Sequence, residues 1–166
     1  MNRISCVGRC LLLFVFVFAT VGQGLFAQNT KKESMEELSY LVGEWIGTSK
    51  IYKEGRVVKE GAAFEKIYYD MDRSILVIEL NSEFLQLRTI ITYHEGDQKY
   101  YYHRFAKDGA AVYPAEFKDG HLIVWKNEQT RFFFTKDEKG DFREYGEQLV
   151  DDEWVMTFED NFVNTQ

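Results

Sequence analysis

The spacing of apolar residues along the chain changes at Gly43. Before this glycine, apolar residues recur every three or four positions, at Met35, Leu38, Leu41 and Val42. Thr30 and Glu33 precede them at the spacing of a capping box, in which a hydroxyl and a carboxylate satisfy free backbone N–H groups. The pattern predicts one short amphipathic helix that ends at Gly43 and packs its apolar stripe into the core.

After Gly43, apolar residues alternate with polar ones, and turn sequences such as Glu54-Gly55, Asp119-Gly120 and Asp151-Asp152 separate the segments. This close spacing leaves no room for crossover helices, so the connections are expected to be hairpins of an antiparallel meander. A long meander has exposed edges unless it closes on itself. We therefore predict an all-β fold, a closed antiparallel up-and-down β-barrel of about ten strands, with the N-terminal helix plugging one end.

The turns also predict which residues face each other. Centring the first hairpin on Glu54-Gly55 places Trp45 opposite Phe64 on the inner face. On the other face Lys50 then lies opposite Lys59, a like-charge pair that requires water.

For the last hairpin, centring on Asp151-Asp152 gives an apolar inner face that also carries charges. Its predicted pairs are Leu149–Trp154, Glu147–Met156, Tyr145–Phe158 and Arg143–Asp160. Glu144 and Glu159 then face each other in water.

Two segments leave alternatives open. Around Gly96, Ile91 faces one of three consecutive tyrosines, so either His103 or its neighbours Tyr102 and Arg104 point inward. The segment 131–134, Arg-Phe-Phe-Phe, is apolar on both faces and predicts a strand covered on its outer side by the helix or by a partner, such as a second copy in a homodimer.

Trp45 lies between two glycines, Gly43 and Gly47. A barrel plugged by a helix needs a large rigid side chain at its floor, and an indole fills that space. Flanking glycines allow the strand to bend and neighbouring backbone to approach.

A short helix, Gly43-x-Trp45 and a long antiparallel meander together resemble the calycin superfamily of lipocalins and fatty-acid-binding proteins. The tail, residues 141–147 and 154–159, is similar to exported bacterial lipocalin-like proteins of unknown function. The resemblance covers nearly all of the chain after residue 27 and implies a closed barrel with a ligand cavity, typically without catalysis. A more distant likeness is to nitrobindin, a haem-binding barrel, but Ser49 replaces its third glycine and no histidine follows His121, so haem is not expected.

The first 27 residues form a separate unit. Arg3 and Arg9 precede an apolar run over residues 11–21, and small residues follow up to Ala27. This is the pattern of a secretory signal peptide, with an uncleaved anchor as the alternative, and it leaves residues 28–166 as one domain. We expect the protein to be exported, and to be periplasmic or secreted.

Composition narrows the chemistry. Cys6 and Cys10 lie inside the signal, so the mature chain is expected to have no disulfide and no thiolate nucleophile. The chain has 20 Lys and Arg against 27 Asp and Glu, which argues against nucleic acid and anionic lipid as partners. Its three histidines show no metal-ligand spacing, so no metal and no cofactor are predicted.

We predict that the barrel binds a small hydrophobic or amphipathic molecule in its lumen, without catalysis. The predicted ligand-binding residues are Trp45, Phe64, His103, Arg143, Tyr145, Glu147, Trp154, Met156 and Phe158, and Asp160 would add polarity. One alternative is a barrel enzyme of the isomerase or proton-transfer type that uses an inner carboxylate or His103. Another is a structural protein whose lumen is packed with its own side chains.

Overall fold

The structure, a computed structural model, describes residues 30–165; the predicted signal peptide lies outside the described residues. The chain begins with helix α1 (Lys31–Glu37) and a single 3-10 turn, η1 (Leu38–Leu41). Ten strands follow: β1 (Gly43–Lys53), β2 (Arg56–Asp70), β3 (Ile75–Ser82), β4 (Gln86–His94), β5 (Lys99–Ala106), β6 (Gly109–Lys118), β7 (His121–Asn127), β8 (Thr130–Lys136), β9 (Phe142–Val150) and β10 (Glu153–Asn164).

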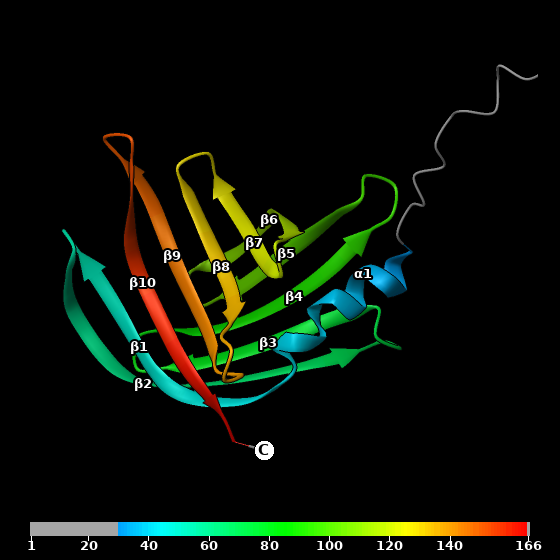
Figure 1. The fold of residues 1–166 in the computed structure, drawn as a ribbon, viewed down its shortest axis with the longest axis horizontal. Helices are drawn as coiled ribbons and strands as arrows, with labels where there is room; N and C mark the ends of the chain where they lie inside the picture. Colours follow the sequence, from blue (N-terminus) through cyan, green and yellow to red (C-terminus); the bar gives the residue numbers. More distant parts are fainter. Residues whose placement is uncertain (1–29, 166) are drawn as a thin grey trace, which may run out of the picture.

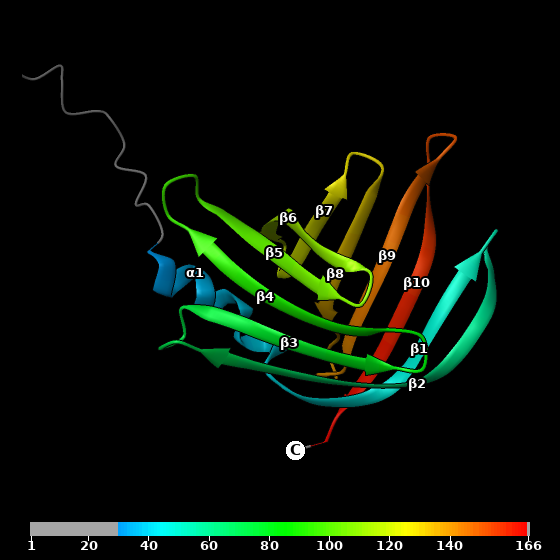
Figure 2. The same ribbon diagram turned by 180° about the vertical axis from the view of Figure 1, so that it is seen from behind.

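Each strand pairs antiparallel with the next, and β10 pairs with β1, so the sheet closes into a barrel (Figures 1 and 2). The prediction of an all-β, closed, antiparallel barrel of about ten strands is confirmed. Closure leaves the sheet without an edge strand. Within residues 30–165, no helix has the length and apolar character needed to cross a bilayer.

Helix α1 begins as its sequence predicts. The Thr30 side chain accepts from the backbone N–H of Glu33, and the Glu33 side chain accepts from the backbone N–H of Thr30. Figure 1 shows α1 beside the β2–β3 and β4–β5 turns, at one end of the barrel. Met35, Leu38 and Leu41 are fully buried there and belong to the main core.

The floor of the barrel near η1 is built around Trp45, which is fully buried as predicted. Its indole N–H donates to the carbonyl of Leu41 at 2.9 Å, and its ring lies 5.4 Å from that of Phe142. Position 47, two residues after Trp45, must be a glycine, because a Cβ at Gly47 would lie 1.8 Å from the carbonyl oxygen of Asn161 on β10. The close approach predicted from the glycine is therefore present where β1 crosses β10.

The predicted register of the first hairpin is wrong by one residue. The turn is where the sequence places it, but Ile51 pairs with Lys59 and Tyr52 with Val57, so Val58 is an extra residue of β2. Such a bulge turns every following side chain to the other face of the sheet. Trp45 consequently pairs with Glu65 instead of Phe64.

The last hairpin contains the same error. Leu149–Trp154 and Glu147–Met156 pair as predicted, but Phe158 then pairs with Gly146, which leaves Thr157 as the extra residue. Beyond this bulge the predicted pairs fail. Tyr145 pairs with Glu159, Arg143 with Asn161 and Glu144 with Asp160.

The open question in the middle of the chain is resolved by the pairing of Ile91 with Tyr102. Tyr102 is buried and Arg104 also points inward, whereas His103 points outward. In β8, Phe132 and Phe134 belong to or pack against the core, and Phe133 faces outward, where it stacks on Tyr145 with ring centroids 4.8 Å apart.

Candidate functional site: an inner cavity with an acidic floor

The barrel encloses a cavity of about 330 Å³ in the half away from α1. Small-molecule sites usually occupy about 300–1,000 Å³, so this space is at the lower end of that range. Most of the wall is apolar, and its main residues are Ile51, Leu80, Leu87, Tyr113, Phe132 and Phe158.

Gly146 positions one of these wall residues. A Cβ at Gly146 would lie 2.2 Å from a ring atom of Phe158 and 3.1 Å from a ring atom of Phe132. The glycine therefore allows the Phe158 ring to lie flat against β9. The two rings are 5.6 Å apart and form one side of the cavity.

The rim of the cavity is formed by the β3–β4 and β5–β6 connections and the end of β7. Its residues are Phe84, Leu85, Arg104, Asp108 and Lys126. Arg104 donates two hydrogen bonds to Asp108, at 2.9 and 3.3 Å, and this pairing lowers the pKa of the Asp108 carboxyl. The rim thus has a fixed ion pair beside two exposed or half-exposed apolar side chains.

The floor of the cavity is acidic. Ser49, Asp160 and Glu144 lie side by side on β1, β10 and β9, because Ser49 pairs with Asp160 and Asp160 with Glu144. All three line the cavity, together with Tyr102. Below them Glu65 is 0 % exposed, against 3 % for Asp160 and 5 % for Glu144.

The environment of these carboxyl groups favours their neutral forms. Burial raises the pKa of Glu65 to about 8, and the Asp160 charge adds to the effect. Burial also raises the pKa of Asp160 to about 6, opposed by a hydrogen bond from Ser49. The pKa of Glu144 is raised well above its ordinary value by burial, then by the charges of Glu65 and Asp160.

Several polar atoms of this floor have no partner within the described part of the chain. Both carboxyl oxygens of Glu65 and Oδ1 of Asp160 are buried without a hydrogen bond. Buried polar groups are normally paired, so orphaned ones call for a specific explanation. Among residues 30–165, no group of three or more His, Cys, Asp or Glu side chains is arranged to hold a metal ion.

Of the predicted ligand-binding residues, Phe158 lines the cavity and Trp45 lies in the floor of the barrel. Phe64 does not, because the bulge at Val58 turns it outward and leaves it 40 % exposed. The pairing that placed it on the inner face is corrected accordingly.

The predicted polar anchors Arg143 and Glu147 lie on the outer surface, because the face of β9 that they share with Tyr145 points outward and only its other face, with Glu144, lines the cavity. Arg143 donates to Glu159 at 2.7 Å and lies over the ring of Tyr145. Glu147 accepts two hydrogen bonds from Arg131, at 3.0 and 2.8 Å.

Two more predicted lining residues lie on that outer surface. Trp154 is covered by Arg131, whose guanidinium carbon is 3.8 Å from the ring centroid. Met156 pairs with Glu147 and shares its outer face. The outer side of β8 is therefore covered by side chains of the barrel itself, including Arg131 and Tyr145.

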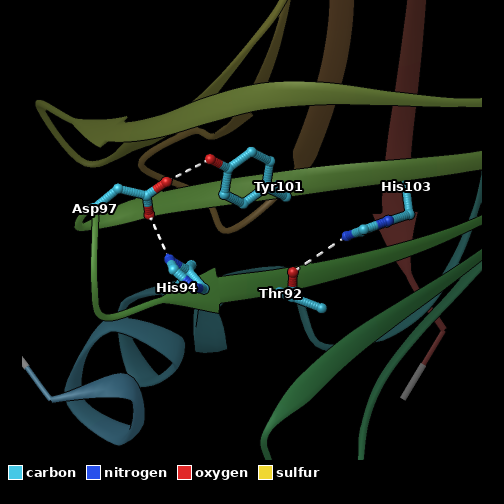
Figure 3. A network of polar contacts seen from close by, with 5 residues as sticks. All are labelled: Thr92, His94, Asp97, Tyr101 and His103. Carbon is cyan, nitrogen blue, oxygen red and sulfur yellow. Dashed lines mark hydrogen bonds and ion pairs between the residues drawn. The ribbon is translucent and has the colours of Figure 1, made fainter.

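His103 is not among the residues that line the cavity, and Figure 3 shows it beside Thr92. Its Nε2 is 3.3 Å from the hydroxyl of Thr92 on the neighbouring strand. Nearby, Asp97 accepts from the Tyr101 hydroxyl and contacts Nδ1 of His94 at 2.9 Å. These polar contacts tie β4 to β5 on the outer surface, and His103 has no contact with the acidic floor.

Glu65 and Glu144 are inner residues that alternation along the sequence placed on the outer face. For Glu65, a signal of its orientation was present in the charges of β1 and β2. With the bulge, Lys50 pairs with Glu60 and Glu44 with Lys66, and both pairs form ion pairs, at 3.7 and 3.0 Å. The unbulged register instead puts Lys50 against Lys59.

The fold and site define a ten-stranded closed antiparallel β-barrel with an inner cavity. No protein-family model matches the chain, and comparison with curated proteins gives no match. Among solved structures, it is similar to a protein of unknown function from the DUF3598 family of Nostoc punctiforme. The two share 6 % identity with a TM-score of 0.28, over 82 % of this chain and 100 % of the other.

Proposed function

We propose that this protein binds a small molecule with an apolar body inside the barrel, without catalysis. The observation that carries the proposal is the cavity of about 330 Å³, which is walled mainly by apolar side chains and backed by unpaired polar groups. An apolar wall with a few convergent polar groups is typical of small-molecule sites. A structural protein with a filled lumen would have no use for this space.

The proposal includes the arrangement of the two ends. The helix closes the end around Trp45, where its buried side chains Met35, Leu38 and Leu41 fill the barrel. The ligand enters at the other end, past Phe84 and Leu85. We further propose that the protein belongs to the calycin group and is exported by its N-terminal 27 residues, so that it acts as an exported lipocalin-like carrier.

Titration with the apolar fluorescent probe N-phenyl-1-naphthylamine, together with native mass spectrometry of the purified protein, tests the proposal. Ile51→Trp places an indole in the cavity and should lower probe affinity by about tenfold or more, because the space for the ligand is filled. Ile46→Trp is the matched control, because Ile46 lies on the same strand but is exposed on the outer face.

Two results would contradict the proposal. The first is a protein that carries no small molecule and does not bind the probe. The second is equal probe binding by wild type, Ile51→Trp and Ile46→Trp, which would place the probe outside the cavity.

A proton-transfer enzyme is a second candidate, favoured by one observation. Asp160 lines the cavity, and burial raises its pKa to about 6, so its carboxylate is a base tuned close to neutrality. Tyr102 and Glu144 face the same space and could donate hydrogen bonds to a developing oxyanion. This role is tested by following, with NMR, the exchange of α-protons of small apolar ketones in D₂O. Asp160→Asn should abolish the exchange. If the wild-type protein accelerates exchange in none of a panel of such ketones, the enzymatic candidate is removed.

A further inference from the structure

Within residues 30–165, the acidic floor of the cavity has no cationic partner. We propose that the ligand carries an organic ammonium group, which binds the carboxyl groups of Asp160 and Glu144 while its apolar body lies against the aromatic walls. This inference rests on the proposed function and names the chemical class of the ligand.

Two carboxyl groups lie side by side at the floor of the cavity. Asp160 and Glu144 are cross-strand partners on the inner face, and both line the cavity. Asp160 is 3 % exposed, and its Oδ1 has no hydrogen-bond partner in the described chain. A buried acceptor left without a donor is destabilising, and an ammonium N–H supplies the donor.

No basic side chain within the described part of the chain supplies this donor. Among the described residues, no lysine or arginine forms an ion pair with Glu65, Glu144 or Asp160. Arg104 and Lys126 stay at the rim, where Arg104 is held by Asp108.

Two arginines of the outer surface near the acidic pair are also engaged. Arg131 pairs with Glu147 and Arg143 with Glu159, both on the far side of the sheet. The deep end of the cavity therefore holds acidic groups, which become negatively charged as they ionise, without a basic partner among the described residues. A carboxylate ligand would be repelled there, and an alcohol would supply one donor but no charge.

The charge of the acidic floor depends on pH. The groups that face Asp160 and Glu144 are Ser49 on β1, Glu65 on β2 and Tyr102 on β5, and the charge of Glu159 also acts on Asp160. None of them is cationic. As pH rises through the raised pKa values of the cluster, its carboxyl groups ionise and attract a cation more strongly. Affinity for an ammonium ligand should therefore increase from pH about 5 to pH about 8, while the amine itself stays protonated.

Three ligands of matched chain length separate the alternatives: octylamine, 1-octanol and octanoate. Each is titrated into the purified protein loaded with N-phenyl-1-naphthylamine, and displacement of the probe is measured at pH about 5 and about 8. At the higher pH, octylamine should displace the probe at concentrations about tenfold or more below those of octanol, as expected for one charge-assisted hydrogen bond. The advantage should shrink at the lower pH.

Variants locate the effect. Asp160→Asn and Glu144→Gln should each reduce the affinity for octylamine towards that for octanol, and unchanged octanol binding shows that the variant is folded. Glu159→Gln is the matched control, since Glu159 is next to Asp160 in sequence but faces outward and binds Arg143 and Tyr52. It should keep the preference for the amine.

The possible failures are distinguishable. If none of the three ligands displaces the probe, or the probe does not bind, the proposed function itself fails. If octanol or octanoate binds as well as octylamine, the cavity proposal stands and the ammonium inference is overturned. A preference for the amine that persists in both Asp160→Asn and Glu144→Gln would also overturn it, because the amine would then bind elsewhere.

Discussion

Replacing Glu65 with glutamine should make the stability of the protein much less dependent on pH. Glu65 is fully buried, does not line the cavity, and both its carboxyl oxygens lack a hydrogen-bond partner in the described structure. Burial raises its pKa from an ordinary 4.5 to about 8. Glutamine has nearly the same shape and cannot ionise, so Glu65→Gln imitates the protonated side chain.

The sign of the effect follows from proton binding. As pH rises above 4.5, the unfolded chain releases the Glu65 proton while the folded protein keeps it until pH about 8. The unfolded state then binds fewer protons than the folded state, so the free energy of unfolding falls with pH across this window. At about 1.4 kcal/mol for each pKa unit, the loss approaches about 5 kcal/mol when complete and is about 3 kcal/mol at neutral pH.

Urea unfolding, followed by tryptophan fluorescence between pH about 5 and 8, measures this difference. Wild type and Glu65→Gln should have similar stability at the acidic end, and the variant should be more stable by about 3 kcal/mol or more at the alkaline end. Glu60→Gln is the control, because Glu60 lies on the same strand, exposed and paired with Lys50. Parallel pH profiles for wild type and Glu65→Gln would refute the reasoning, since they would mean that Glu65 ionises in the folded protein as it does in the unfolded chain.

Three further substitutions test the packing of the barrel. Gly47→Ala should lower the free energy of unfolding by at least about 2 kcal/mol, because its Cβ would lie 1.8 Å from the Asn161 carbonyl oxygen; an unchanged urea midpoint would contradict this close approach. Gly146→Ala should displace Phe158, whose ring atom lies 2.2 Å from the new Cβ, and should weaken binding of N-phenyl-1-naphthylamine, which fluorescence titration measures; equal affinity would show that this wall does not shape the site. Leu38→Ala should cost about 2–5 kcal/mol in urea unfolding, because Leu38 is fully buried where the helix meets the barrel; a loss below about 1 kcal/mol would show that the helix is not part of the core.

Much of the fold could be predicted because its signals are local. The capping box at Thr30 and Glu33 sets the start of α1, and the alternation after Gly43 sets the strands. The turns at Glu54-Gly55 and Asp151-Asp152 lie where their sequences place them. Closure follows from the number of strands and the absence of crossover helices.

The candidate site could not be predicted in the same way because two single residues decide which side chains face inward. Val58 and Thr157 are extra residues in their strands. Each shifts the pairing of the rest of its strand by one residue, so that the following side chains point to the opposite face of the sheet. Simple alternation counted from the turn therefore places Phe64 inside and Glu65 outside. A bulge leaves little trace in the local sequence, so only the agreement of distant partners can reveal it.

The pairing of strands that are distant in sequence also shows why the acidic floor of the cavity differs from the rest of the core. The bulged registers are favoured by large apolar side chains, since they bury Ile67, Phe142 and Phe162 almost completely. Each such side chain contributes about 1.5–3 kcal/mol, which exceeds the small gain from moving like charges apart on the wet face. The same registers bring Asp160 against Glu144 inside the barrel, where the two carboxyl groups repel each other.

Nothing in the packing requires acids at these positions. Apolar side chains of similar volume in place of Asp160 and Glu144 would fill the floor, keep both registers and remove two raised carboxyl pKa values. Sequences that break a local rule without a structural gain do so mainly at functional sites. The acidic pair is therefore better explained by a group that enters the cavity from outside than by the stability of the barrel. The higher stability expected of Glu65→Gln would show that buried acids at this floor destabilise the fold when they have no partner.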